Sequence, residues 1–399
     1  MLVLHRAPFD KIGYDRALDH ALHDIVYLGT EESLRDIPRT LRCTQRILVK
    51  NQSPYSHVQL HRTDFDGTTH VVGTSEYNRR FAAQIRKLLG CPGMLPDDYD
   101  AVDNKVIMKK RIRDAHLRVP GFMTLAAFVA GEGPTWKGPT VLKPQVGSGS
   151  EGVVAFRSID DLWEAVSSGV IAQGADIERL EIEEFVEGEI YHFDGFAHEG
   201  NVAFVQPSRY HGTPLAFSLG EPLGSMHVDD GELAREAATY VRAAGVQDAV
   251  FHLEMIASPR GLVFMEIAPR PGGCRVVECI REKWGVDLAL VDVAIQAGES
   301  PPRGLERKTD DLFGSYIVPG HLHKGMRCRV QFPQELERYV IDRETVDHDY
   351  VFDGELSYFA GELPLSLLLR LRPDTIAADI FAQLDKDVTV EYSAEPLTK

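Results

Sequence analysis

Two glutamates in the second half of the chain, Glu254 and Glu266, are spaced so that one hairpin can bring their carboxylates together. A three-residue turn with Gly261 in the left-handed region would pair Ser258 with Leu262 and set the glutamates opposite each other. Facing residues have Cβ atoms about 4.5 to 5.5 Å apart, so the carboxylates would repel unless a cation lay between them. Magnesium suits this position, because it takes one or two carboxylates and completes its shell with phosphate oxygens. A two-residue turn would instead put the pair on opposite faces, and the alternative interpretation is an exposed hairpin with screened charges.

A glycine-rich stretch, residues 147–152, lies between two β-type runs and is called the glycine loop below. A dinucleotide site needs a helix after its third glycine, so the order strand, loop, strand argues against that site. Such a hairpin can instead fold its backbone amides and serine hydroxyls over a polyphosphate. Lys143, four residues before the loop, would place an ammonium beside the same phosphates. The alternative is a flexible surface hairpin. The predicted phosphate contacts are Gly147, Ser148, Gly149 and Ser150.

Arg270 follows Glu266 by four residues, in a stretch rich in proline and glycine. The prolines end the strand, and the glycines permit close backbone approach to a ligand. An arginine fork at this point can hold a phosphoryl oxygen or a developing negative charge. Taken alone, this segment favours the interpretation of an ordinary exposed loop arginine.

The net charge of the chain limits the classes of molecule that it can bind. Lys plus Arg number 43 and Asp plus Glu number 60, which gives a formal net charge of −17. Such a field repels phosphate backbones and anionic membranes, so we expect neither nucleic acid nor a membrane as partner. The five cysteines show no zinc-site spacing, and no stretch resembles a signal peptide or a membrane span. We therefore expect reduced thiols and a cytoplasmic protein.

The elements that must position these groups divide the chain into three units, giving a multidomain α/β and α+β protein. Residues 1–98 alternate short strands and helices like an open α/β layer, and its last helix is expected at residues 76–89, after Ser75 and before Gly90. Residues 99–300 carry the glycine loop and the glutamate hairpin, and end in a helix expected at residues 276–297. Residues 301–399 read as a mixed C-terminal α+β unit.

Taken together, these residues resemble the ATP-grasp superfamily over residues 69–297. The resemblance implies a pre-ATP-grasp domain at residues 1–98, an ATP-grasp domain at residues 99–300 with a small lid at about 120–185, and a C-terminal domain. Five strings occur in the family's order. They are the stretch around Gly73 and Glu76, the lysine helix from Asp103 to Lys109, Lys143 with the glycine loop, the hinge at residues 182–189, and Glu254 with Glu266 and Arg270.

The resemblance also assigns roles to residues. The hinge backbone would read adenine, with Glu183 near the exocyclic amine and Phe185 or Val186 lining the slot. Glu254 and Glu266 would be the magnesium ligands, and Arg270 and Lys143 the catalytic residues. The implied nucleotide contacts outside the glycine loop are Lys105, Lys143, Glu183, Glu184, Phe185, Val186, Glu189 and His192.

Two positions depart from the family's pattern. The family usually has an asparagine metal ligand two residues after the second glutamate, where this chain has Ala268, which puts a second fully ligated ion in doubt. An acidic residue that contacts ribose is replaced by Ile190. His192, on the same strand face, is a candidate for the sugar contact, and a structural histidine is the alternative.

The implied activity is an ATP-dependent carboxylate–amine ligase that works through an acyl phosphate, similar to the L-amino-acid ligases, with ATP and Mg²⁺ as cofactors. Small-molecule acids and amines would be the partners, and a homodimer is expected only by analogy. An acceptor pocket built partly from residues 206–220 and the C-terminal unit would include Arg209, Tyr210 and His211, and the alternative interpretation of this stretch is an ordinary connecting loop. The alternatives are an ATP-grasp carboxylase, an acid–thiol ligase, or a nucleotide-binding regulator without chemistry, which Ala268 favours.

Overall fold

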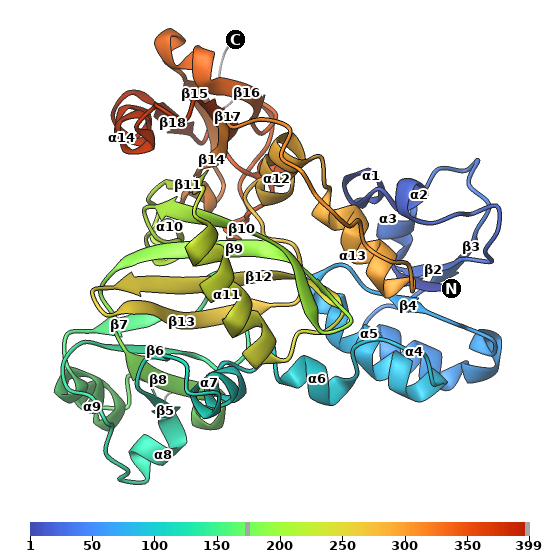
Figure 1. Cartoon of the computed structure of the whole chain (residues 1–399), viewed down its shortest axis with the longest axis horizontal. Helices are drawn as coiled ribbons and strands as arrows, with labels where there is room; N and C mark the ends of the chain where they lie inside the picture. The colour runs from blue at the N-terminus through green and yellow to red at the C-terminus, as the bar shows by residue number, and fades with distance from the viewer. Residues whose placement is uncertain (172–175, 396–399) are drawn as a thin grey trace.

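The computed structural model of the chain describes residues 1–171 and 176–395. Its N-terminal part is an open parallel sheet with strand order β3-β2-β1-β4 (Figure 1). Successive strand residues point to opposite faces, so Leu2 and Leu4 pack with Ile85 on one face, and Val3 packs with Val293 on the other. The predicted open α/β layer is thus confirmed. The elements are β1 (Leu2–Leu4), β2 (Val26–Gly29), β3 (Thr44–Ile47), β4 (Val71–Val72), α1 (Phe9–Ile12), α2 (Tyr14–Ala17), α3 (Glu31–Leu34), α4 (Pro54–Leu60) and α5 (Glu76–Leu89).

Helix α5 has the predicted bounds. The Ser75 hydroxyl caps its first turn by accepting the Asn78 N–H at 3.2 Å, which satisfies a donor that no helical carbonyl can reach. Gly90 ends it at φ 73°, a left-handed conformation that glycine adopts without strain. This cap fixes where the helix starts and therefore where Glu76, its first residue, points.

A small antiparallel sheet, with strand order β5-β8-β6-β7, follows α6 (Pro96–Asp100) and α7 (Lys105–Asp114). Its core joins Leu142 and Ile182 to Leu125 and Leu162 of the two covering helices. The elements are β5 (Phe122–Thr124), α8 (Leu125–Val129), β6 (Thr140–Pro144), β7 (Val154–Phe156), α9 (Ile159–Ser167) and β8 (Leu180–Glu184). The predicted lid covers the same stretch, and residues 172–175 of it lie outside the described part.

The largest layer is an eight-stranded antiparallel sheet with strand order β13-β12-β9-β10-β11-β14-β17-β16 (Figure 1). Helices α7 and α11 (Gly231–Ala244) cover the apolar face of its first strands, where Phe193, Phe251 and Phe264 are buried. The opposite face of the same strands carries buried polar side chains, among them Asp194 and His252, beside the apolar Phe196 and Val250. The strands are β9 (Glu189–His198), β10 (Asn201–His211), β11 (Leu223–His227), β12 (Ala249–Ser258), β13 (Gly261–Ala268), β14 (Leu312–Val318), β16 (Val340–Glu344) and β17 (Leu365–Leu371).

Three strands of the C-terminal region, β14, β17 and β16, continue the eight-stranded sheet. Strand β14 pairs with β11, so the eight-stranded sheet runs across the expected boundary near residue 300. The remaining elements are α10 (Pro214–Ser218), α14 (Ala377–Asp387) and the two-stranded pair β15 (Arg327–Gln331) and β18 (Thr389–Ser393). Residues 396–399 of the predicted C-terminal unit are outside the described chain. None of the described helices combines the length and apolar character needed to cross a bilayer.

The single helix expected at residues 276–297 is wrong. The chain forms two helices there, α12 (Val276–Trp284) and α13 (Leu288–Gln296). Gly285 ends the first at φ 75°, and the Asp287 carboxylate caps the second by accepting the backbone N–H groups of Ala289 and Leu290. The break lets α12 contact β14 while α13 reaches the N-terminal sheet.

Candidate functional site

The hairpin β12–β13 brings Glu254 and Glu266 face to face, as predicted, but by a different route. Its turn has two residues, because Ser258 pairs with Gly261, so the predicted three-residue turn is wrong. Such a turn alone would have put the glutamates on opposite faces. A β-bulge inserts Met265 opposite the bond between Glu254 and Met255 and shifts the register by one residue. The pairing Glu254↔Glu266 is therefore restored by the bulge.

Glu254 lies on β12, next to the edge strand β13, and is fixed by two hydrogen bonds. Its side chain is buried, and its Oε1 accepts a hydrogen bond from the Tyr210 hydroxyl at 2.8 Å and one from His252 Nε2 at 3.4 Å. Burial alone would raise the pKa of Glu254, but the bond and charge of His252, together with Tyr210, hold it below its usual value. Glu254 therefore stays an anionic oxygen ligand at neutral pH.

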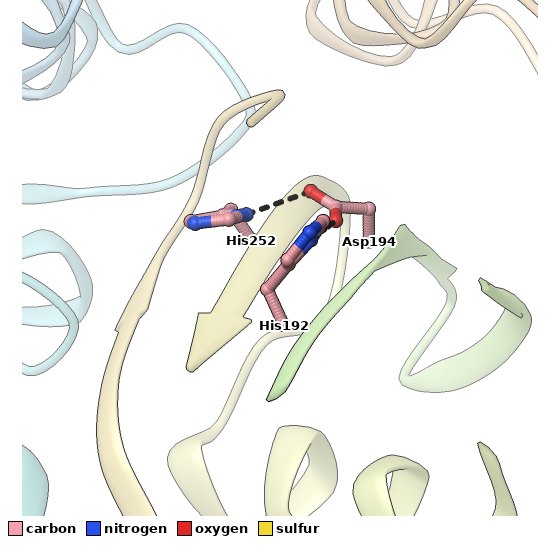
Figure 2. Close-up of side chains that lie close together, drawn as sticks. All are labelled: His192, Asp194 and His252. Atoms are coloured by element: carbon pink, nitrogen blue, oxygen red, sulfur yellow. Dashed lines mark hydrogen bonds and ion pairs between the residues drawn. The ribbon is translucent and has the colours of Figure 1, made fainter. Parts of the chain in front are cut away.

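The buried carboxylate of Asp194 orients His252. Figure 2 shows the Asp194 carboxylate facing the imidazoles of both His192 and His252. His252 Nδ1 lies 2.8 Å from Asp194 Oδ1, and His192 Nδ1 lies 2.5 Å from Oδ2. Burial opposes protonation of His252, yet the charge of Asp194 raises its pKa to about 10. A Cβ on Gly272 would lie 2.6 Å from Asp194 Oδ1, so glycine at this position lets the chain after Arg270 pass over the pair.

His192 has both ring nitrogens committed within the protein, since its Nε2 lies 2.5 Å from the Ser225 hydroxyl. A contact with ribose would have to displace one of these bonds. The sugar role assigned to His192 therefore stays a prediction, and its visible role is to bind Asp194 Oδ2 while His252 binds Oδ1. Asp194 is buried, which alone would raise its pKa, but His252 and His192 hold that pKa below its usual range.

Lys105 places a positive charge opposite the β12–β13 hairpin. It is the first residue of α7, where Asn104 caps the helix by accepting two backbone N–H groups. The Lys105 ammonium lies 3.3 Å from Glu266 Oε2 and donates to the Gly147 carbonyl at 2.5 Å. Lys105 therefore joins the glutamate hairpin to the glycine loop.

Lys143 joins a buried cluster of four charges. Its ammonium donates to Glu183 Oε1 at 2.6 Å, and Lys109 donates at 2.6 Å to both Glu183 Oε2 and Glu181 Oε1. Burial would raise the pKa of Glu183, but the two lysines lower it to about 2. The adenine role of Glu183 stays a prediction, because its carboxylate is engaged by these lysines. The sequence did not lead us to Glu181 or to the pairing of Lys109. Only their spacing could have indicated them, because Lys109 lies one helical turn after Lys105 and Glu181 lies two residues before Glu183.

Arg270 faces the glycine loop from the other side. Its Nε donates to Glu76 Oε2 at 2.7 Å, and Glu76 lines the same small cavity as Ser148. This cavity is also lined by Lys105 and Glu266 as well as by Arg270. A larger groove, about 870 Å³ in volume, lies between α2 and α13 and is lined by none of the predicted site residues.

The hinge residues are placed at the junction of the small and large sheets. The Phe185 amide donates to Pro139 O, and Glu184 accepts from the Gly121 amide, both at 3.0 Å. Val186 follows Phe185 in the chain, and Glu189, three residues later, pairs with Arg209 at 3.1 Å. Nothing in these contacts tests a nucleotide role for the four hinge residues.

The acceptor candidates on β10 divide between the two faces of the sheet. Tyr210 contacts Glu254 and so belongs to the site. Arg209 and His211, its neighbours along the strand, point to the other face. Arg209 pairs with Glu189, and His211 lies 2.6 Å from Asp385. Only Tyr210 of the three therefore faces the carboxylates.

No family model matches the chain. It is 26% identical over 231 residues to an L-arginine-specific L-amino acid ligase of Bacillus subtilis, a match that covers 55% of each chain. It is 29% identical over 249 residues to carnosine synthase 1 of Mus musculus, covering 58% of this chain and 27% of that protein. The matched stretch thus spans about half or less of these relatives' own lengths.

Solved structures match nearly the whole chain. An L-amino acid ligase from Bacillus licheniformis superposes with a TM-score of 0.71 at 17% identity, covering 98% of both chains. The chain has the ATP-grasp fold. An N5-carboxyaminoimidazole synthetase from Staphylococcus aureus complexed with ADP matches with a TM-score of 0.63 at 12% identity, over 96% of both chains. At such identities the likeness concerns the ATP-grasp fold itself, and the predicted fold class is confirmed.

Proposed function

We propose that this ATP-grasp protein is an ATP-dependent carboxylate–amine ligase that joins amino-acid-like substrates through an acyl phosphate. One observation carries the proposal: Glu266, Lys105 and Arg270 line one small cavity with the glycine loop, with Lys105 only 3.3 Å from Glu266, which pairs with Glu254 in the sheet. Opposite charges on two sides of one small cavity suit a triphosphate with its metal ion. The names of the sequence relatives, an L-amino acid ligase and carnosine synthases, support amino acids as the substrate class.

The donor set fits magnesium. Glu254 and Glu266 offer hard carboxylate oxygens on neighbouring strands, the ligand type that Mg²⁺ prefers. When bound, the ion would neutralise charge on the phosphoryl oxygens. Ala268 brings no side-chain oxygen to the same face, so the hairpin supplies two ligand side chains.

The chain's own residues would act on two substrates in turn. A carboxylate oxygen attacks the γ-phosphorus of ATP, the bond to the β-phosphate oxygen breaks, and ADP leaves. Lys105 and Lys143 would stabilise the charge that develops on the phosphoryl group. The amine nitrogen then attacks the acyl carbon, phosphate leaves, and the nitrogen loses a proton. Arg270 would hold the phosphate end through both steps, exchanging its bond to Glu76 for one to the substrate.

A cytoplasmic location is part of this proposal. All five cysteines lie in the described part of the chain and are unpaired. Unpaired thiols are typical of reducing compartments, where ATP is also supplied.

The proposal is tested by incubating the protein with ATP, Mg²⁺ and pools of acids with amines. We expect ADP, phosphate and amide to form in equal amounts, with the amide detected by mass spectrometry. Thiols and bicarbonate in separate pools test the acid–thiol and carboxylase alternatives. Nucleotide binding without phosphate release in any pool would support a regulator instead.

Asp194→Asn is expected to weaken magnesium binding. Asparagine keeps the shape of Asp194 but removes the charge that keeps His252 protonated and aimed at Glu254. Loss of such a supporting partner typically costs about 10- to 100-fold in metal affinity. Calorimetry of ADP binding over a range of Mg²⁺ concentrations measures this without any turnover.

The matched control is Asp248→Asn. Asp248 also binds a histidine, His198, at 2.9 Å, but on the exposed rim of the sheet. We expect it to leave the Mg²⁺ dependence unchanged. Equal Mg²⁺ dependence in Asp194→Asn and the parent protein would show that Asp194 does not position Glu254.

A further inference from the structure

A long connection in the C-terminal region lies against the glycine loop. Strands β16 and β17 are antiparallel neighbours, which two to five residues can usually join. The chain instead uses residues 345–364, called the strap below. It is ordered by its own contacts: the Val346 amide donates to Leu363 O at 3.1 Å, and Phe352 is buried. Long ordered connections in compact domains are often functional.

Tyr358, near the end of the strap, contacts the tip of the glycine loop. Its hydroxyl donates to the Gly149 carbonyl at 3.3 Å. A Cβ on Gly149 would lie only 3.1 Å from the tyrosine ring, and one on Gly273 would lie 3.5 Å from its Cβ. The ring also packs on Phe217, with centroids 5.0 Å apart. Tyr358 therefore lies between the glycine loop and the loop that follows Arg270.

The glycine loop is thus held by two distant parts of the chain. Lys105 of α7 binds Gly147, and Tyr358 of the strap binds Gly149. Glu76 of the N-terminal layer lines the same cavity as Ser148, the residue between them. Lys105 and Glu76 are charged groups that a bound triphosphate and substrate would compete for. Tyr358 is neutral and packs through its ring. A bound triphosphate would therefore not compete with the glycine loop for Tyr358. The strap reaches the N-terminal layer as well, where Lys11 lies 5.8 Å from the Phe359 ring.

We propose that Tyr358 is a positioning residue that latches the glycine loop over the site and thereby keeps water from the acyl phosphate. The water-excluding half rests on the proposed function. An acyl phosphate exposed to water is lost by hydrolysis: the water oxygen bonds to the acyl carbon, the bond to the phosphate oxygen breaks, and carboxylate, phosphate and a proton result. A closed loop prevents this loss while the amine binds.

The latch itself is tested by amide hydrogen exchange of the whole protein, with mass detection of peptides from the glycine loop. Loss of a neutral hydrogen bond and a ring contact in Tyr358→Ala should speed exchange there by about tenfold. Tyr358→Phe keeps the ring and should speed it by only a few-fold, and it serves if the alanine variant folds poorly. Tyr350→Ala, in the same strap but packed on Phe352, should change nothing in the glycine loop. Unchanged exchange in both Tyr358 variants would overturn the latch.

The second measurement is the ratio of phosphate released to amide formed. We expect a ratio near one in the parent protein and in Tyr350→Ala, and a several-fold higher ratio in Tyr358→Ala. Faster exchange with an unchanged ratio would overturn the water-excluding role. If no acid and amine give product at all, the proposed ligase function fails, whereas the exchange result still decides whether Tyr358 holds the loop.

Discussion

Glu266→Gln is expected to lower ATP-dependent amide formation by roughly 10²- to 10³-fold, the range for removing one electrostatic group from a transition-state site. Glutamine keeps the side-chain shape but brings no negative charge to the metal or to Lys105, which lies 3.3 Å away. The fold should survive, because this side chain is 29% exposed and its amide can be hydrated. Initial rates of product formation and the thermal midpoint, measured on one preparation, separate the two effects.

Glu236→Gln supplies the control for that variant. Glu236 is an exposed residue of α11, so the same chemical change should leave the rate intact. Full activity in Glu266→Gln at saturating Mg²⁺ would remove Glu266 from the metal site and with it the mechanism proposed above.

Local sequence signals predicted the positions of the site residues better than the backbone that positions them. The letters around Glu254 and Glu266 indicated a hairpin with a left-handed glycine, and Gly261 has φ 101°. The turn has one residue fewer than expected, and the bulge at Met265 compensates. A bulge depends on how β13 packs against its neighbours, and no residue type marks it in the sequence. The correct pairing was therefore predicted for an incorrect reason.

The polar interior behind the site could not be derived from local pattern. Asp194, His252 and Tyr210 are far apart in the chain and meet only because β9, β10 and β12 are neighbours in the sheet. Alternation along each strand indicates which side chains share a face, but strand order is a property of the whole fold. The same limit applies to Tyr358, whose contact with Gly149 joins residues more than 200 positions apart.

The cluster of Lys109, Lys143, Glu181 and Glu183 ties α7 to the small sheet that carries the glycine loop. Two positive and two negative groups balance in it, and Lys109 and Glu181 have no exposed side-chain surface. Burial raises the pKa of Glu181 even with Lys109 beside it. Removing one partner of such a buried set leaves an uncompensated charge, which costs more than the pair contributes.

Lys109→Met should therefore lower the free energy of unfolding by about 3 to 5 kcal/mol, measured by urea titration. Methionine fills similar volume, so the loss reflects the unpaired Glu181 more than a cavity. A carboxyl whose folded pKa is raised destabilises more as pH rises above its unfolded value, so the loss should be smaller at pH 5 than at pH 8. Lys110→Met, on the exposed side of the same helix, should change stability by less than about 0.5 kcal/mol. Adding Glu181→Gln to Lys109→Met removes the unpaired charge and should recover much of the loss, whereas no recovery would mean that packing around Lys109, and not charge, holds α7 to the sheet.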